Sequence, residues 1–182
     1  MSDALDFSFD ELDEVTKPGN TDGHIKTVSQ QLAQGIYCHP FYIALPYSWA
    51  THIVEEFELV AVPKSAPWMA GITNVAGVIL PVVDLSVYFS PHLPPKPISR
   101  QHRLLVGGDL GSDIGGDDTV PIALLFERLP NQVRSARRPL SNPASLPPAL
   151  EQLCQGELTD GNGQFFFEIC PELLTQALLQ TL

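Results

Sequence analysis

Basic residues are scarce in this sequence. Of its 182 residues, ten are lysine or arginine and 21 are aspartate or glutamate, which gives a formal net charge of −11 at neutral pH. A protein that follows a nucleic-acid backbone or lies on an anionic membrane needs a basic surface to do so. The sequence therefore predicts neither a nucleic-acid partner nor a membrane-docking surface.

Cysteines and long apolar runs are also few. Cys38, Cys154 and Cys170 are far apart and outside any C-x-x-C pattern, which predicts reduced, mostly buried thiols and no zinc site. The longest apolar stretch, 75–83, is much shorter than the ~20 residues of a membrane helix. The first residues lack the basic and apolar regions of a signal peptide. These absences predict a cytoplasmic protein with no direct membrane insertion.

Sequence motifs of catalysis and metal binding are absent as well. The five histidines form no H-x-x-x-H pair, the serines form no G-x-S-x-G elbow, and there is no phosphate-binding G-x-x-x-x-G-K loop. The sequence therefore predicts a protein that is not an enzyme, with no catalytic residue, no cofactor and no metal.

The Asp-rich loop 107–119 leaves one alternative open. Its sequence, GGDLGSDIGGDDT, places four aspartates among five glycines without the spacing of an EF-hand. Converging carboxylates could bind calcium, and a solvated hairpin connection would have the same composition. The alternative function is therefore a small β-barrel metal-binding regulator or hydrolase that uses this loop.

Acidic residues are concentrated at the start of the chain. Residues 1–28 contain seven acids and two lysines, a net charge of −5 out of −11. The segment lacks a continuous hydrophobic face, which predicts a disordered N-terminal tail, with 29–182 as the folded domain. A capping-box pattern at 8–11 also permits a short helix on a partner. Elsewhere, arginines 128, 134, 137 and 138 form a basic stretch that either receives an acidic surface or is a solvated face.

From residue 32 onward, short apolar runs alternate with Gly, Pro, Asn and Asp, which predicts a mostly β barrel or sandwich with two or three short helices. The run 78–83 is apolar on both faces and should be covered on both sides, with Pro81 at an edge or bulge. Asp84 should cap a short helix over 85–89, and Pro171 should begin a C-terminal helix. The other expected strands are 36–38, 41–45, 54–62, 103–106, 121–126 and 165–169.

The most specific pattern in the chain lies in residues 62–85. Gly71, Asn74 and Gly77 are spaced three apart, and an apolar strand follows that contains Pro81 and ends in Asp84-Leu85. This segment resembles the CheW-like domain family, and the resemblance extends over about 34–179. The N-terminal tail and the long linkers also resemble the PilI-type branch found in type IV pilus chemosensory systems.

The resemblance implies a fold and a function. The fold would be mostly β, with two small SH3-like five-stranded β barrels packed together, a few short helices, and the strand 78–83 where the barrels meet. A short helix would follow the opening strand pair within 34–54. The function would be that of a non-enzymatic adaptor that couples chemoreceptors to a CheA-type histidine kinase, in chemotaxis or type IV pilus twitching motility. The implied partners are the regulatory domain of the kinase and the cytoplasmic tip of a chemoreceptor.

The resemblance also implies where the partners bind. The sequence departs from the family pattern at two contacts. Ala76 stands where the family usually has an arginine that contacts the receptor, so a guanidinium is missing, and His52 stands where a glutamate usually lies near the kinase. The residues themselves suggest that Asn74 bonds its own turn and that the two glycines permit unusual backbone angles. Apolar groups near Val75 and Val78 would supply contact area. The expected partner-binding residues are His52, Ile53, Gly71, Asn74, Val75, Ala76, Gly77 and Val78.

Overall fold

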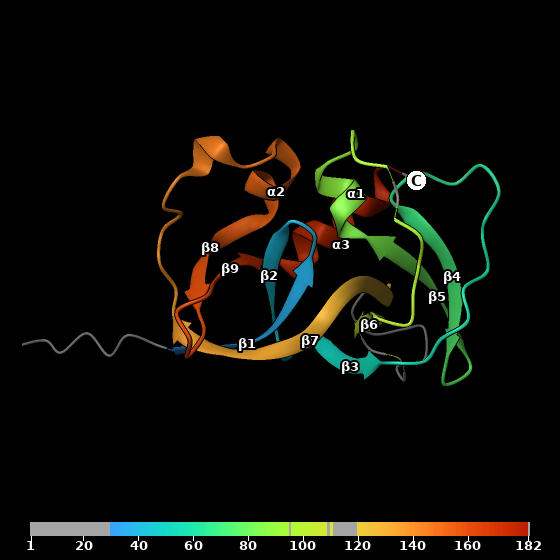
Figure 1. Ribbon diagram of the computed structural model, residues 1–182, viewed down its shortest axis with the longest axis horizontal. Helices are drawn as coiled ribbons and strands as arrows, with labels where there is room; N and C mark the ends of the chain where they lie inside the picture. Colours follow the sequence, from blue (N-terminus) through green and yellow to red (C-terminus); the bar gives the residue numbers. More distant parts are fainter. Residues whose placement is uncertain (1–29, 95, 109, 111–119, 182) are drawn as a thin grey trace, which may run out of the picture.

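Nine strands and a few short helices make up the part of the chain that this computed structural model describes, which is residues 30–94, 96–108, 110 and 120–181 (Figure 1). The predicted tail 1–28 and most of the Asp-rich loop lie outside the described residues. The elements in chain order are β1 (Gln30–Cys38), β2 (Phe41–Pro46), β3 (Ala50–Val54), β4 (Met69–Val75), β5 (Val78–Asp84), α1 (Leu85–Phe89), β6 (His102–Gly107), β7 (Ile122–Ala136), a 3-10 turn (Pro143–Ser145), α2 (Pro148–Leu153), β8 (Cys154–Thr159), β9 (Phe165–Ile169) and α3 (Pro171–Leu179).

Strand β7 belongs to both halves of the fold. Its first part pairs antiparallel with β6 and parallel with β5, and its second part pairs antiparallel with β1. Between these parts, Arg128 has a φ of +69°, and the β1 ladder shifts register between Gly35 and Tyr37. The first barrel thus contains β3, β6, β7, β5 and β4, and the second contains β7, β1, β2, β9 and β8. The expected pair of five-stranded barrels is confirmed.

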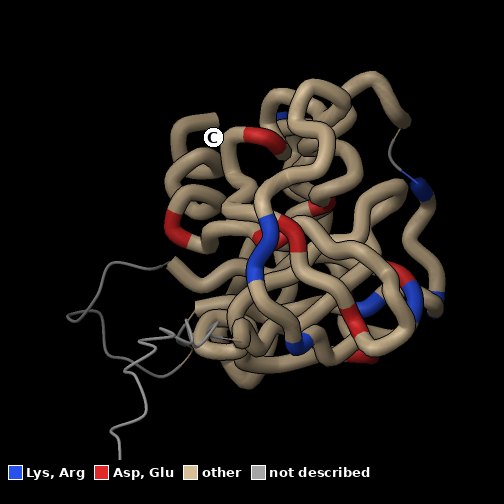
Figure 2. Tube along the Cα trace, turned by 90° about the vertical axis from the view of Figure 1, so that its left-hand side faces the viewer, with Lys and Arg blue, Asp and Glu red and all other residues tan. Residues whose placement is uncertain are grey.

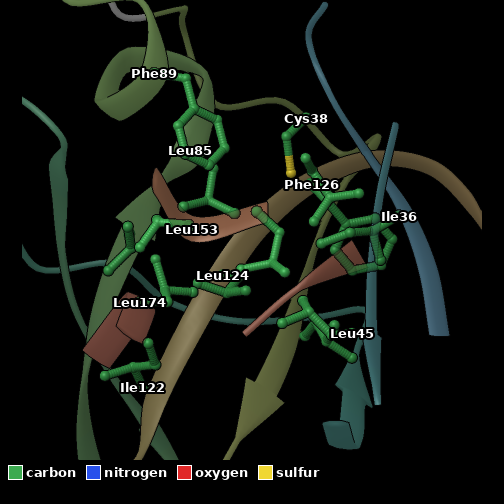
Figure 3. Packing of buried hydrophobic residues seen from close by; sticks show 14 of the residues in the cluster. Ile36, Cys38, Leu45, Leu85, Phe89, Ile122, Leu124, Phe126, Leu153 and Leu174 are labelled. Atoms are coloured by element: carbon green, nitrogen blue, oxygen red, sulfur yellow. The ribbon is translucent and has the colours of Figure 1, made fainter. Parts of the chain in front are cut away.

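The core lies between the two barrels and inside each of them. Successive side chains of a strand point to opposite faces, so Leu124 and Phe126 of β7 enter the central cluster while Ala123 and Leu125 enter the first barrel. The residues of the central cluster that are labelled in Figure 3 come from β1, β2, β7 and all three helices. The second barrel encloses a smaller cluster of Ala33, Ala44, Val133, Leu158 and Phe166.

The strand at 78–83 behaves as expected only in its second half. Val82 packs inside the first barrel and Val83 packs in the central cluster, so both faces are covered there. Ile79, by contrast, is 68% exposed, so the expectation of two-sided cover is wrong at this end. Pro81 pairs with Ile72 of β4, and the pairing with β7 begins one residue later, which confirms its edge position.

Local capping signals were predicted correctly. Asp84 Oδ1 accepts hydrogen bonds from the backbone N–H groups of Ser86 (2.9 Å) and Val87 (3.4 Å), and helix α1 follows. Helix α3 begins at Pro171, as its sequence indicated. Helix α2 was not predicted from the residues. No helix among the described residues is both long enough and apolar enough to cross a membrane.

The predicted strand over 54–62 is wrong. Strand β3 ends at Val54, and a bend at Glu55 and Glu56 follows. Phe57 and Leu59 then pack, partly buried, against the cluster inside the first barrel. The segment lacks a ladder of its own because only one isolated bridge, at Val60, joins it to β4. The helix implied within 34–54 is also wrong, since a turn and β3 occupy the place after β2.

Candidate docking surface

The tip of the β4–β5 hairpin is a two-residue turn that the sequence specifies. Val75 pairs with Val78, which leaves Ala76 and Gly77 as the loop, with φ values of +51° and +91°. Positive φ at both positions is the hairpin geometry that matches the twist of the flanking strands. Asn74 Oδ1 accepts a 2.9 Å hydrogen bond from Gly77 N, which confirms that Asn74 bonds its own turn. The exposed tip therefore presents the methyl group of Ala76.

Gly71 shapes the hairpin from inside. It is buried, its φ is +151°, and the β4–β5 register shifts between Met69 and Gly71. A Cβ atom at this position would lie 2.5 Å from the carbonyl oxygen of Val60. Only glycine lets the backbone around Val60 approach β4 this closely. We therefore assign Gly71 a role in the shape of the hairpin.

The outward face of the hairpin is apolar. Residues directly opposite each other in an antiparallel pair share a face, and the pairs here are Val60 with Ile72, Ile72 with Pro81, and Asn74 with Ile79. Val60 and Ile79 are 61% and 68% exposed. We call this surface the hairpin face; its residues are Val60, Ile72, Asn74, Ile79 and Pro81.

The expected contact residues Val75 and Val78 lie elsewhere. Both are half-buried and pack against the cluster inside the first barrel. The exposed apolar area near them comes from Ile79 and Val60, which the sequence analysis did not select. The period of two along β5 contained the signal, because a buried Leu80 requires Ile79 to face the other way.

Strand β3 forms a second exposed patch on the same barrel. Thr51, His52 and Ile53 are all exposed, and a register shift between Ala50 and His52 interrupts the alternation of faces at Thr51. Among the described strands, β3 pairs with β6 alone, so it is an edge strand. We call residues 51–53 the edge patch. Of the expected site residues, the structure places His52 and Ile53 on the edge patch, Asn74, Ala76 and Gly77 at the exposed hairpin tip, and Gly71, Val75 and Val78 largely inside. The edge patch and the hairpin lie at opposite ends of one five-stranded ladder.

A groove of about 400 Å³ lies where the barrels join, beside the corner of β7. The guanidinium carbon of Arg128 is 3.8 Å from the centroid of the Tyr37 ring, and Arg128 Nη1 donates a 2.7 Å hydrogen bond to the Tyr42 hydroxyl. Leu129 is 71% exposed at its rim. From its sequence position, Arg128 was expected only as one charge of a basic stretch, and no sequence pattern indicated this groove.

The described residues include three free cysteine thiols and no cluster of metal ligands. Within that part of the chain, no group of three or more histidine, cysteine or acidic side chains could hold a metal ion. Cys38 and Cys170 are buried free thiols, and Cys154 is a half-buried one. Burial, together with the charges of Asp84 and Glu127, raises the pKa of the Cys38 thiol, so the thiol stays protonated at neutral pH.

The chain is similar to known proteins in both sequence and fold. The sequence model of the CheW-like domain matches residues 38–178. Among solved structures, the chain is similar to the scaffolding protein TtCheW from Thermoanaerobacter tengcongensis, with a TM-score of 0.58 and 15% sequence identity over 78% of this chain and 90% of that one. No curated protein matches the sequence. Because the matched region covers well over half of the chain, the protein belongs to the CheW-like domain family.

Proposed function

We propose that this chain is a non-enzymatic adaptor of chemosensory signalling that couples chemoreceptors to a CheA-type histidine kinase. The match to the CheW-like domain over residues 38–178 is the observation that carries the proposal. The two patches on the first barrel support it, because an adaptor that holds two partners together needs two separate surfaces.

The edge patch is the proposed contact for the kinase. An edge strand offers unpaired backbone N–H and C=O groups to a partner strand, and side chains around it provide specificity. Ile53 is 39% exposed and supplies apolar area, while His52 brings no fixed negative charge to this position. A kinase regulatory domain that binds this patch would therefore need a basic residue opposite position 52 less than the family's usual glutamate implies.

The hairpin tip and the hairpin face are the proposed contact for the receptor. Asn74 uses its side-chain oxygen within the turn, and Ala76 carries no charge. The most exposed apolar side chains of the hairpin face are Val60 and Ile79. The receptor contact is therefore proposed to be apolar, where the family usually uses an arginine.

Two matched variants test this assignment. Ile53→Asp and Ile79→Asp make the same change at exposed isoleucines on different patches. Binding to the kinase regulatory domain and to a receptor signalling-tip fragment is measured by calorimetry. We expect Ile53→Asp to weaken kinase binding at least about tenfold and Ile79→Asp to weaken receptor binding by as much, each leaving the other partner unaffected.

Several outcomes would contradict the proposal. Absence of kinase binding at about 100 μM would mean a standard free energy weaker than about −5.5 kcal/mol, and would exclude the adaptor function. Equal loss of both partners in one variant would mean that the patches are not separate. Thermal unfolding of each variant is the control, because an unfolded variant would also lose both partners.

The motility output is proposed from the resemblance to the PilI-type branch. We propose that the chain acts in type IV pilus twitching, with swimming chemotaxis as the alternative. Deletion in the native cell, followed by assays of surface twitching and of swimming, distinguishes the two. Loss of swimming alone would overturn the assignment to twitching.

A further inference from the structure

Two exposed arginines at the end of β7 lie beside the place where the described chain begins. Arg134 pairs with Leu32 of β1, and Gln30 pairs with Ala136. Arg134 and Arg138 are exposed, and Leu32 is 38% exposed at the position opposite Arg134. We call Leu32, Arg134 and Arg138 the β7-end patch. It lies on the second barrel, away from both the edge patch and the hairpin face.

Neither Arg134 nor Arg138 forms an ion pair with another described residue. Arg137, between the two arginines in sequence, donates to both carboxylate oxygens of buried Glu168 and to Gln155. Figure 2 turns toward the viewer the side of the molecule on which β8 and the beginning of β1 lie. The two arginines therefore remain positive groups on a protein of net charge −11.

The N-terminal segment matches this patch in charge and in reach. Residues 1–28 carry a net charge of −5, and Phe7, Phe9 and Leu12 are interspersed among their acids. Asp22 is eight residues before Gln30, a stretch that can span up to about 28 Å. Arg134 is only two strand residues, about 7 Å, from the position opposite Gln30. Covalent attachment gives the segment a high effective concentration at the patch.

We propose that the β7-end patch is the docking site of the chain's own acidic segment, residues 1–28. Acidic side chains of the segment pair with Arg134 and Arg138, and its apolar side chains cover Leu32. Individual exposed ion pairs contribute little, so the association is weak and sensitive to salt. The proposal does not depend on which partners the two patches of the first barrel bind.

The test uses the full chain and amide nuclear magnetic resonance spectra of the N-terminal segment. Spectra are recorded at about 20 mM and about 500 mM NaCl, where the Debye lengths differ several-fold. We expect the signals of residues 1–28 to move with salt in the parent protein. In the Arg134→Glu/Arg138→Glu variant, the amide signals of residues 1–28 at low salt should already match those of the parent protein at high salt.

A matched control and a charge exchange make the test specific. Lys64→Glu/Arg100→Glu changes the net charge by the same amount at exposed positions of the first barrel, and it should preserve the salt response. Adding Asp13→Lys/Glu14→Lys to the Arg134→Glu/Arg138→Glu variant exchanges the charges of segment and patch, and should restore the salt response of the N-terminal signals. The proposal is overturned if the parent shows no salt response, if both double variants respond alike, or if the charge exchange restores nothing. Unchanged signals for residues 30–181 verify that each variant is folded.

Discussion

The guanidinium group of Arg128 stacks on the ring of Tyr37, 3.8 Å from its centroid, at the corner where β7 leaves the first barrel. Arg128 has a φ of +69°, a backbone conformation that costs a residue with a side chain about 1 kcal/mol. The stacking contact and the hydrogen bond to Tyr42 offset that cost. The side chain thus stabilises the corner that connects the barrels.

Arg128→Ala should lower the free energy of unfolding by about 1–2 kcal/mol, because it removes the stacking contact and keeps the left-handed backbone. Arg128→Gly should lower it less, since glycine adopts this backbone without strain. Arg134→Ala is the matched control on the same strand and should change stability by less than about 0.5 kcal/mol. Urea denaturation measures all three, and equal losses in the two alanine variants would contradict the role of the corner.

Asp160 should make stability depend on pH in the acid range. Burial alone would raise the pKa of this carboxyl, but hydrogen bonds from the backbone of Gln164 and Asn162 and from the Asn131 amide lower it below its usual range. A depressed folded-state pKa stabilises the fold above the unfolded pKa of about 4, and this stabilisation is lost as the pH falls through the folded value.

We therefore expect the parent protein to lose more stability between about pH 5 and pH 2 than Asp160→Asn does. Denaturation series at several pH values measure the difference between the two proteins. Identical pH dependence in both would show that Asp160 has the same pKa in the folded and unfolded chains.

Gly71 and Gly77 should respond differently to the same substitution. Gly77 has a φ of +91° and open space where a Cβ would lie, so Gly77→Ala should cost about 1–2 kcal/mol from backbone strain alone. Gly71→Ala would add a clash with the Val60 carbonyl and should cost more than about 3 kcal/mol. Thermal unfolding compares the two variants. A Gly77→Ala variant that is the less stable of the two would contradict this account of the hairpin.

Ala76→Arg should strengthen receptor binding about tenfold if the receptor binds at the hairpin tip, because it restores a charge and a fork of donors. Ala76 already has a left-handed backbone, so arginine adds little strain. Ala144→Arg adds the same charge at an exposed position of the second half and is the control. Unchanged or weaker receptor binding by Ala76→Arg would mean that the receptor contact lies elsewhere.

Calcium should not stabilise the protein. The Asp-rich loop 107–119 lacks the ligand spacing of an EF-hand, so we expect no shift in the thermal midpoint at millimolar calcium. A calcium-dependent rise in the midpoint that is lost in Asp117→Asn/Asp118→Asn would instead support the metal-binding alternative.

Features set by neighbouring residues could be predicted from the sequence. The capping aspartate at 84, the proline that begins α3 and the turn role of Asn74 depend on contacts within a few residues. The two-barrel fold followed from the resemblance carried by residues 62–85. The strand expected at 54–62 is wrong because a strand requires a hydrogen-bonded neighbour along its length. Phe57 and Leu59 are partly buried by the first barrel without such a neighbour.

The candidate surfaces were harder to predict because exposure depends on distant partners. Ile79 is as apolar as Val78, and only its position next to buried Leu80 along β5 shows that it faces outward. Arg128 looked like one charge in a basic stretch, yet its contacts, Tyr37 and Tyr42, come from strands more than 80 residues earlier. Tertiary contacts at such separations leave no pattern within a local window of sequence.

Because β7 contributes backbone hydrogen bonds to both barrels, no independent linker separates them. Moving one barrel relative to the other would require bending at residues 128–130 or breaking ladder bonds on β7. A partner attached to either barrel is therefore held at a fixed distance and orientation relative to the other. The distance between a surface on the first barrel and a surface on the second is therefore set by β7 itself.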